Sequence, residues 1–328
     1  MNKASQQTAS LPRIITLLYH RVDSRESDPW GICVSIERFE EQIHFLKNSF
    51  NIISSGDLIK QVMNHTIPEK AICITFDDGY ADNYTNARPI LDKYKCPATF
   101  FISTAFIGSN IPFWWEELQL ILLHSIKLPG KLLLKIHGEK HSYTFDENKL
   151  TKKQLLLHTR WKWYEDPPTD RCEIFLKIWK QLSVLLIGEI QINMAMLREW
   201  AVSVDVGNSL MPMNDQQVIG LIQNPLFTIA MHTHTHPDLK GKNITFQTEE
   251  ILICKKNLQS KYGIESNCLA YPFGKYDKNT IQTVKDLGID VSFTTYASSI
   301  YANSTRSRLG RYQVFDESRT SLQNRLNF

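Results

Sequence analysis

The run "AICITFDDGY", Ala71 to Tyr80, joins six residues without a charge to two adjacent carboxylates and a glycine. The continuous apolar stretch Ala71–Phe76 favours a strand that is buried on both faces of a parallel sheet. In α/β barrels, active-site groups collect where such strands end. Asp77 and Asp78 share a site only if the chain turns between them, and Gly79 makes a turn easy. Asp-Gly is also an ordinary turn signal, so both a site and a plain turn remain open.

Strand-like runs alternate with helical patterns along most of the chain. The further runs are "IITLLY" (14–19), "ATFFIS" (98–103), "LFTIAM" (226–231), "CLAYPF" (268–273) and "VSFTT" (291–295). Helices are expected after Ser35 as N-cap, over about 84–94, after a capping box at Asn214 and Gln217, over about 248–262 before Gly263, and up to Gly288. Buried strands between helices predict a parallel sheet covered on both sides, so the fold class is α/β.

The section 110–209 breaks this alternation. It opens with the apolar helical stretch "IPFWWEELQLILLHSIK" (111–127), followed by a hairpin pattern turning around Gly138. Two or three helices follow, one of them with Thr169 as N-cap. We interpret this section as a mostly helical insertion of roughly 100 residues into a single catalytic domain over 1–328. A separate helical domain is the alternative, but the α/β pattern resumes after the section and needs both halves.

Composition excludes several classes of protein. The 328 residues are 42% hydrophobic and carry a net charge of +3, with no basic cluster that would indicate nucleic-acid binding. The six cysteines are scattered without a CxxC pair, which indicates reduced, mostly buried thiols. The N-terminal residues lack the apolar segment of a signal peptide, and no run is long enough to span a membrane. We therefore expect a cytoplasmic protein.

The stretch "HTHTH" holds three histidines in five residues, His232, His234 and His236. A catalytic zinc ion has three protein ligands and one open position. On a helical turn His232 and His236 would share a face, whereas on a strand all three would. Pro237 disfavours helical geometry at His236, which indicates a bend after the strand. The pattern predicts a metal site without selecting its histidines, and a histidine-rich surface loop is the alternative.

Together, these stretches resemble the polysaccharide deacetylases, carbohydrate esterase family 4. The resemblance is carried by "TFDDGY" (75–80), "HTHTH" (232–236) and "YPFG" (271–274), in that order. "LLYHRV" (17–22), "ADNYTNARPILDKYKCPATFFIST" (81–104) and "FWWEEL" (113–118) resemble a subgroup with an N-terminal YH motif. The resemblance covers most of residues 14–110 and 210–295, and only the start of the insertion. It implies a distorted (β/α)7-type barrel.

The resemblance also implies roles for individual residues. Asp77 would be the general base, while Asp78, His232 and His236 would hold the metal, with Thr233 completing an H-[ST]-x-x-H motif and His234 left out. One carboxylate and two imidazoles suit Zn²⁺, with Co²⁺ or Ni²⁺ as alternatives. The metal would activate a water and polarise an amide carbonyl, and Asp77 would take the proton.

Further residues are assigned to the substrate. Tyr80, Tyr271, Pro272 and Phe273 are the predicted substrate-binding residues, and a backbone N–H near Phe273 would stabilise the oxyanion. Two tryptophans at the start of the insertion, at positions 114 and 115, suit either a sugar-binding wall or core packing.

The chain departs from the family pattern at two positions. Most members supply the acid from a late L-x-H motif, but His236 is the last histidine here, and "RLGRYQV" with Arg308 and Arg311 stands near that place. Ala270 stands where many members carry an arginine. The YH subgroup supplies a histidine from the first strand, so His20 is the candidate acid.

The predicted function is metal-dependent hydrolysis of the N-acyl amide, first of all N-acetyl, of an amino sugar. A deformylase or another amide hydrolase on the same scaffold is an alternative. A cytoplasmic location would favour a nucleotide- or lipid-linked sugar precursor as the substrate. A catalytically inactive carbohydrate-binding member also remains open. An HxH-type metal hydrolase would place its motif on the first strand, but only 92 residues follow His236.

Overall fold

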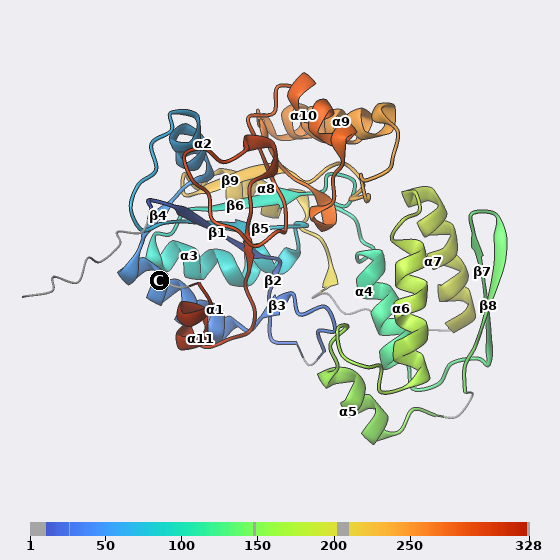
Figure 1. The fold of residues 1–328 in the computed structure, drawn as a ribbon. Helices are drawn as coiled ribbons and strands as arrows, with labels where there is room; N and C mark the ends of the chain where they lie inside the picture. The colour runs from blue at the N-terminus through green and yellow to red at the C-terminus, as the bar shows by residue number, and fades with distance from the viewer. Residues whose placement is uncertain (1–10, 26, 147–148, 202–209, 327–328) are drawn as a thin grey trace, which may run out of the picture.

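The chain folds into a parallel α/β barrel with a second lobe on one side (Figure 1). In this computed structural model, the described residues are 11–25, 27–146, 149–201 and 210–326. The strands run in the order β11-β10-β9-β6-β5-β1-β12, and their pairings are parallel. Their bounds are β1 Ile14–Tyr19, β5 Ala71–Phe76, β6 Ala98–Ile102, β9 Phe227–Met231, β10 Cys268–Ala270, β11 Val291–Phe293 and β12 Tyr312–Gln313. The curled sheet confirms the predicted distorted barrel class.

The central strand β5 is paired along its whole length with β1, from Ile14↔Ala71 to Tyr19↔Phe76. Two strands share its other edge. The short β4 (Asn51–Ile53) pairs with the first half of β5, and β6 pairs with the second half. Every residue of β5 is buried, as its continuous apolar sequence predicts. The carboxyl ends of the neighbouring parallel strands β1, β5 and β6 therefore lie together, and Asp77 follows the end of β5 at this edge of the sheet.

The segment before β12 links the two outer strands of the sheet. Leu309 forms a parallel bridge with Phe293 at the end of β11, and its carbonyl accepts a hydrogen bond of 2.8 Å from the Thr294 N–H. A few residues later, the Val314 N–H donates to the carbonyl of Leu18 in β1. The segment 309–314 therefore crosses from β11 to β1 and connects the two sides of the curled sheet. Arg311 lies on this segment.

Helices cover the barrel as the alternation predicts. They are α1 Ile36–Ser49, α2 Ser55–Met63, α3 Arg88–Tyr94, α8 Asp215–Ile222, α9 Ile244–Tyr262, α10 Lys278–Asp286 and α11 Arg319–Arg325, with the π-helical turn η1 Asn83–Ala87 before α3. The capping box at Asn214 and Gln217 and the left-handed C-cap at Gly263 are confirmed. Helix α9 begins four residues earlier than predicted, because the Asn243 side chain caps it by accepting from the Phe246 N–H.

The second lobe has a hydrophobic core of its own, which includes Leu118, Leu122, Phe175 and Leu197. Its elements are α4 Trp114–Gln119, the π-helical turn η2 Leu120–His124, the hairpin β7 Lys131–Ile136 and β8 Glu139–Thr144, α5 Lys152–Arg160, α6 Asp170–Leu182 and α7 Ile187–Ala201. The hairpin turns at His137 and Gly138, whose φ angles of 50° and 83° suit a two-residue turn. Residues 202–209 of the predicted insertion lie outside the described residues, and the division into domain and insertion stays a prediction.

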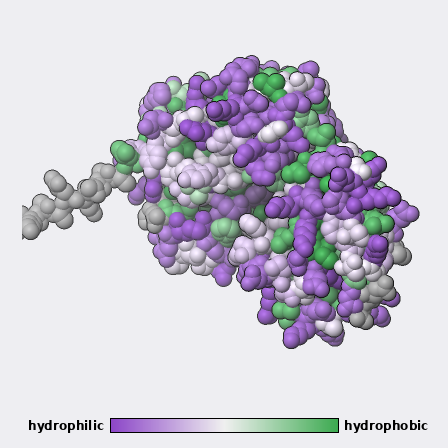
Figure 2. Space-filling model, turned by 45° about the vertical axis from the view of Figure 1, so that its right-hand side comes forward, coloured by the Kyte–Doolittle hydropathy of each residue, from purple (hydrophilic) through white to green (hydrophobic). Residues whose placement is uncertain are grey.

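The two lobes meet at an indentation, and most of the surrounding face is hydrophilic with scattered hydrophobic residues (Figure 2).

All six cysteines are free and buried, as their scattered spacing predicts. Among the helices of the described ranges, none has both the length and the apolar character required to cross a bilayer.

Candidate metal centre and active site

The two carboxylates after β5 are brought into one site by a sharp turn. Asp78 has a φ of 73° and Gly79 a φ of 89°, so the chain reverses at both residues. The His232 Nε2 atom lies 3.9 Å from Asp77 Oδ2 and 3.3 Å from Asp78 Oδ1. The turn that would let both carboxylates share a site is therefore present, and it begins at Asp78 itself. A β-carbon on Gly79 would lie 3.0 Å from the side chain of Ile102, so the turn also fits a confined space.

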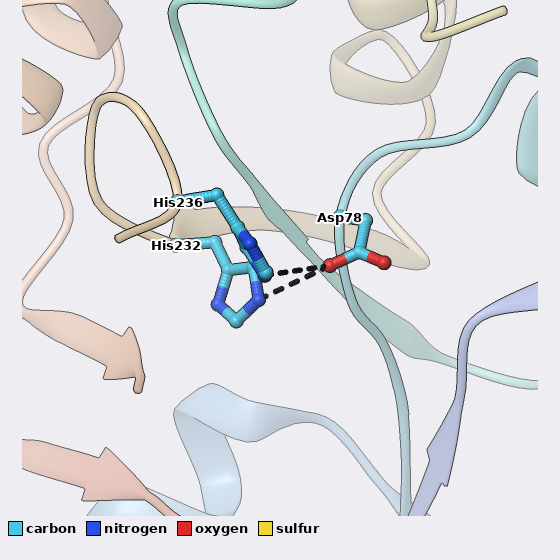
Figure 3. Close-up of side chains that lie close together, drawn as sticks. All are labelled: Asp78, His232 and His236. Carbon is cyan, nitrogen blue, oxygen red and sulfur yellow. Dashed lines mark ion pairs between the residues drawn. The ribbon is translucent and has the colours of Figure 1, made fainter. Parts of the chain in front are cut away.

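Three potential metal ligands converge beside this turn (Figure 3). Asp78 Oδ1 lies 3.3 Å from His232 Nε2 and 3.2 Å from His236 Nε2. Their ligand atoms all lie within 4.8 Å of one another, and all three residues are buried. Buried polar groups in such an arrangement require a cation or protons between them.

The hydrogen bonds and charges around His232 are compatible with a cation at this site. Its Nδ1 atom lies 2.8 Å from the carbonyl oxygen of Ala270, which can only accept, so Nδ1 carries the proton. With a metal bound, Nε2 would be the unprotonated nitrogen that ligates it beside Asp78. Burial lowers the pKa of His232, but Asp77 and Asp78 more than offset this, and the pKa rises above its usual value. The surrounding charges thus favour positive charge at the point where the three ligands meet.

The loop that carries the histidines is held in an uncommon backbone conformation. Thr233 has a φ of 64° and His236 a φ of 58°, and a β-branched residue rarely adopts such an angle. The Thr233 hydroxyl accepts a hydrogen bond of 3.1 Å from the His236 N–H. This contact explains in physical terms why a hydroxyl residue follows the first histidine of the motif. Strained backbone of this kind is retained where the surrounding structure enforces a site.

His234 points away from the other two histidines. Its Nδ1 atom lies 3.0 Å from the Thr104 hydroxyl. Its backbone N–H and that of Thr235 donate to the buried Glu250 carboxylate of α9, at 3.0 and 2.8 Å. His234 therefore supports the loop, and Glu250 is a supporting residue that sequence reasoning missed. The sequence signal for it is a carboxylate on the helix face that also carries Ile251, Cys254 and Leu258.

Arg311 forms a bidentate ion pair with Asp77. Its two terminal nitrogens lie 2.7 and 2.6 Å from the Asp77 oxygens, its Nε donates to the Thr294 carbonyl, and its side chain is fully buried. Burial alone would raise the pKa of Asp77, but Arg311 and then His232 lower it below its usual value. Ala270 leaves the usual arginine position empty, and Arg311 supplies the guanidinium from the segment that links β11 to β12.

A cleft of about 370 Å³ lies over these groups, between the barrel and the second lobe. Its lining includes Asp77, Asp78, His232, His236 and the predicted acid His20. Burial lowers the pKa of His20, and its Nδ1 atom is buried with no hydrogen-bond partner among the described residues. The structure thus places all five predicted catalytic and metal-binding residues in one cleft of a size typical for small-ligand sites.

The predicted substrate-binding residues divide into two groups. Phe273 lines the cleft, and its ring lies 4.7 Å from that of His236. Its φ is 57°, and no acceptor for its backbone N–H is found in the described part of the chain. Tyr271 and Pro272 are buried and do not line the cleft, and the Tyr271 hydroxyl donates to the Ser307 carbonyl. Phe273 therefore reaches the cleft, whereas the two residues before it lie in the interior.

Tyr80 also lies behind the site. It is fully buried, and its hydroxyl donates to Glu116 at 3.0 Å while accepting from the Trp115 indole at 2.7 Å. Trp115 in turn lies against the His236 ring, with ring centroids 5.0 Å apart. Tyr80 thus positions a wall of the cleft through Trp115 and does not line the cleft itself.

A buried network of charges joins this wall to the barrel. The fully buried Arg21 lies 2.8 Å from Asp82 and 3.4 Å from Glu116, which also pairs with Arg25 at 2.9 Å. Burial raises the pKa of Glu116, but Arg25 and Arg21 offset this, and the pKa falls below its usual value. The network links residues after β1 and β5 to α4 at the start of the insertion.

Comparison with known proteins places the chain in a family. A sequence profile of the family described as polysaccharide deacetylase matches residues 64–161 and 182–292, more than half of the chain. This chain belongs to the polysaccharide deacetylases. The family assignment made from the motifs is thereby confirmed.

Curated relatives match this polysaccharide deacetylase over part of its length. The protein YxkH of Bacillus subtilis is 29% identical over 44% of this chain and 53% of its own. The poly-beta-1,6-N-acetyl-D-glucosamine N-deacetylases of Staphylococcus aureus MRSA252 and Staphylococcus epidermidis are 38% and 33% identical, over 36% and 29% of this chain. The matches span only 39% and 38% of those two staphylococcal proteins.

Two solved structures share the fold of this chain over nearly its whole length. The deacetylase PplD of Streptococcus pyogenes aligns with a TM-score of 0.57 at 20% identity, covering 96% of this chain and 98% of its own. IcaB from Ammonifex degensii aligns with a TM-score of 0.58 at 16% identity, covering 95% and 96%. At these identities the agreement concerns the fold.

Proposed function

We propose that this chain is a metal-dependent deacetylase that hydrolyses the N-acetyl amide of an amino sugar in a glycan. The observation that carries the proposal is the convergence of Asp78, His232 and His236 beside Asp77. One carboxylate and two imidazoles fit Zn²⁺, with Co²⁺ or Ni²⁺ as alternatives. The family assignment and the names of the staphylococcal relatives support N-acetylglucosamine as the type of sugar.

The residues of the cleft divide the reaction between them. A bound divalent cation would polarise the amide carbonyl and ease deprotonation of water. Asp77 accepts the proton of the attacking water, because Arg311 keeps its carboxylate ionised. The Phe273 N–H donates to the oxyanion of the tetrahedral intermediate. His20 takes up the proton that Asp77 has accepted from the water and passes it to the leaving amine as the C–N bond breaks, which yields acetate and a free amino sugar.

The proposal is tested by measuring acetate and primary amine released from N-acetylglucosamine oligomers by the purified protein loaded with Zn²⁺. Removal of the metal with a chelator should stop the release, and added Zn²⁺ should restore it. Release that persists without metal would refute the metal dependence. Oligomer binding without release under every metal tested would instead favour the inactive carbohydrate-binding member. Faster release of formate from N-formyl analogues would favour a deformylase.

The pH dependence of the reaction tests the role of Arg311. Because Arg311 lowers the pKa of Asp77, Arg311→Lys should raise that pKa and move the acidic limb of kcat/KM to higher pH. The loss in kcat/KM should be largest at acidic pH, and it should shrink as the pH rises. Arg308→Lys is the matched control, since Arg308 does not contact Asp77 and should leave the limb in place. A loss of equal size at every pH would show that Arg311 acts only on folding.

The role of His20 is tested through the leaving group. His20→Gln should lower kcat/KM for an N-acetyl amine by about 100-fold, because the departing amine needs a proton. An aryl acetate ester, whose leaving group departs without a proton, should lose much less activity. Equal losses on the amide and the ester would contradict acid catalysis by His20.

The expected cytoplasmic location and a nucleotide or lipid carrier for the sugar stay predictions.

A further inference from the structure

The imidazole of His20 reaches the cleft without a partner for its second ring nitrogen. His20 lines the cleft together with Asp77 and Asp78, and its Nδ1 atom has no hydrogen-bond partner among the described residues. Histidines that transfer protons are commonly oriented by a group that binds the other ring nitrogen. The direction of the His20 ring must therefore be fixed by its packing and by the backbone that carries it.

That backbone leaves the barrel sheet at His20. Strand β1 ends directly before it, and the next two residues form β2 (Arg21–Val22), whose only pairing partner within the described strands is β3 (Cys33–Val34). The Arg21 N–H donates to the Ile32 carbonyl, next to β3. Because the backbone groups of successive residues in a strand face opposite edges, those of His20 and Val22 face away from β3 and need other partners.

Three side chains in and next to the turn η1 supply these partners. Asn83 Nδ2 donates to the His20 carbonyl at 2.8 Å. Asp82 Oδ1 accepts from the Val22 N–H at 3.1 Å, and Asn86 Nδ2 donates to the Val22 carbonyl at 2.8 Å. Asp82, Asn83 and Asn86 thus form a brace that takes the place of a neighbouring strand along the segment that carries His20.

The brace is itself held in a defined geometry. Asn83 is fully buried, and Asp82 is buried beside it. The Asp82 carboxylate also accepts from Asn83 Nδ2 at 3.0 Å and from Arg21 Nε at 2.8 Å. The Arg88 N–H donates to the Asn83 carbonyl, which makes the turn π-helical. Such turns are rare inside helices and occur frequently at functional sites.

The brace lowers the stability of the fold. Burial raises the pKa of Asp82 to about 6, although Arg21 opposes this rise. The Asn83 Oδ1 atom is buried with no partner among the described residues, and an unpaired buried acceptor is destabilising. An apolar residue at position 83 would avoid this penalty but could not bind the His20 carbonyl. Unpaired polar groups of this kind call for an explanation in function.

We propose that Asp82 and Asn83 are positioning residues for His20. They hold the backbone at the His20 carbonyl and at the Val22 N–H, and so direct an imidazole without a partner of its own toward the leaving amine. Asn86 extends the brace to the Val22 carbonyl. This inference rests on the proposed deacetylase reaction. Loss of the brace should slow proton transfer to the amine and leave the metal ligands in place.

The choice of leaving group provides the kinetic test. Asn83→Ala should lower the ratio of kcat/KM for an N-acetyl amine to kcat/KM for an aryl acetate ester by about tenfold, since a displaced acid transfers its proton less well. Zn²⁺ affinity should stay within about threefold of the wild-type value, because the Asn83 amide contacts Asp82 and the His20 backbone.

Asn193→Ala is the matched control. Asn193 is an equally buried asparagine whose amide also donates to a backbone carbonyl at 2.8 Å, but it lies in the second lobe and does not line the cleft. Its substitution should lower stability without changing the ratio of amide to ester. Equal losses on amide and ester in Asn83→Ala, or an unchanged ratio in the folded variant, would overturn the proposal.

Two further variants keep the test decisive. Asn86 is only half-buried, so Asn86→Ala should fold even if Asn83→Ala does not, and it should lower the ratio by about threefold. An unchanged ratio in Asn86→Ala when Asn83→Ala fails to fold would overturn the proposal. Added to His20→Gln, Asn83→Ala should lower the ratio no further, because residues that act as a unit are not additive. A further tenfold fall, about the full effect of Asn83→Ala alone, would show that Asn83 acts without His20.

Hydrogen exchange separates this inference from the proposed reaction. The Val22 N–H is bonded to Asp82, so its exchange rate, measured by NMR, reports how firmly the segment is held. In Asn83→Ala that rate should rise about tenfold, whether or not the protein releases acetate, and in Asn193→Ala it should change much less. An unchanged rate would refute the brace and leave the reaction intact. A faster rate beside an unchanged ratio in His20→Gln would retain the brace and refute His20 as the acid.

Discussion

Asp77→Asn is expected to lower kcat/KM for acetate release by about 10³-fold while the protein still binds its metal. The amide has nearly the same shape as the carboxylate but cannot accept the proton of the attacking water. The three ligands Asp78, His232 and His236 remain in place, so metal binding should persist. Acetate release and metal content, measured on the same preparation, check both parts of the expectation.

Folding must be monitored in this variant, because Arg311 loses the anion that it pairs with in a buried position. Removal of one partner of a buried ion pair costs about 3–5 kcal/mol, so a lower melting temperature is expected. The double substitution Asp77→Asn with Arg311→Met removes both charges and should recover part of that stability without recovering activity. Full activity in Asp77→Asn would exclude Asp77 as the base.

His232→Ala and His236→Ala are each expected to weaken metal binding by more than about 100-fold, since loss even of a supporting contact costs up to that factor. Activity at a fixed low Zn²⁺ concentration should fall by at least the same factor. The reason is that each imidazole supplies one of three protein ligands, and a two-ligand site holds Zn²⁺ weakly.

His234→Ala provides the control within the same loop. Its ring contacts Thr104 and lies outside the ligand cluster, so metal affinity should stay within about threefold of the wild-type value. Titration of the metal-free proteins with Zn²⁺ measures all three variants under the same conditions. Metal retained by His236→Ala but lost by His234→Ala would favour an HxH pair as the ligands instead.

The parts of the fold that local sequence controls were predictable. The strands β1, β5 and β9 follow from continuous apolar runs, because buried parallel strands need no polar face. Asp78, His232 and His236 came from the family motifs, and the structure brings these three together. The spacing of the histidines alone left their choice open, since strand and helix geometry select different pairs.

The contacts that sequence did not predict join distant segments or depend on backbone turns. Arg311 pairs with Asp77 across 234 positions, and only its place near the missing late motif drew attention to it. Tyr80 and Tyr271 belong to the motifs, but both are fully buried, because the chain turns next to them at Asp78 and at Phe273. A turn can therefore bring one neighbour of a catalytic residue into its site, as with Asp77 and Asp78, and leave another in the interior.

The buried charges that connect Arg21 to Glu116 bear on how this fold can diversify. Excision of the insertion would remove Glu116 and leave the guanidinium of Arg21 with fewer partners in an apolar interior. Trp115 would leave with it, and His236 would lose a neighbouring ring. The first helix of the second lobe, α4, is thus tied to the site by these buried contacts. The helices α5 to α7 carry none of these charges, so we expect changes in them to disturb the buried network less than changes in α4.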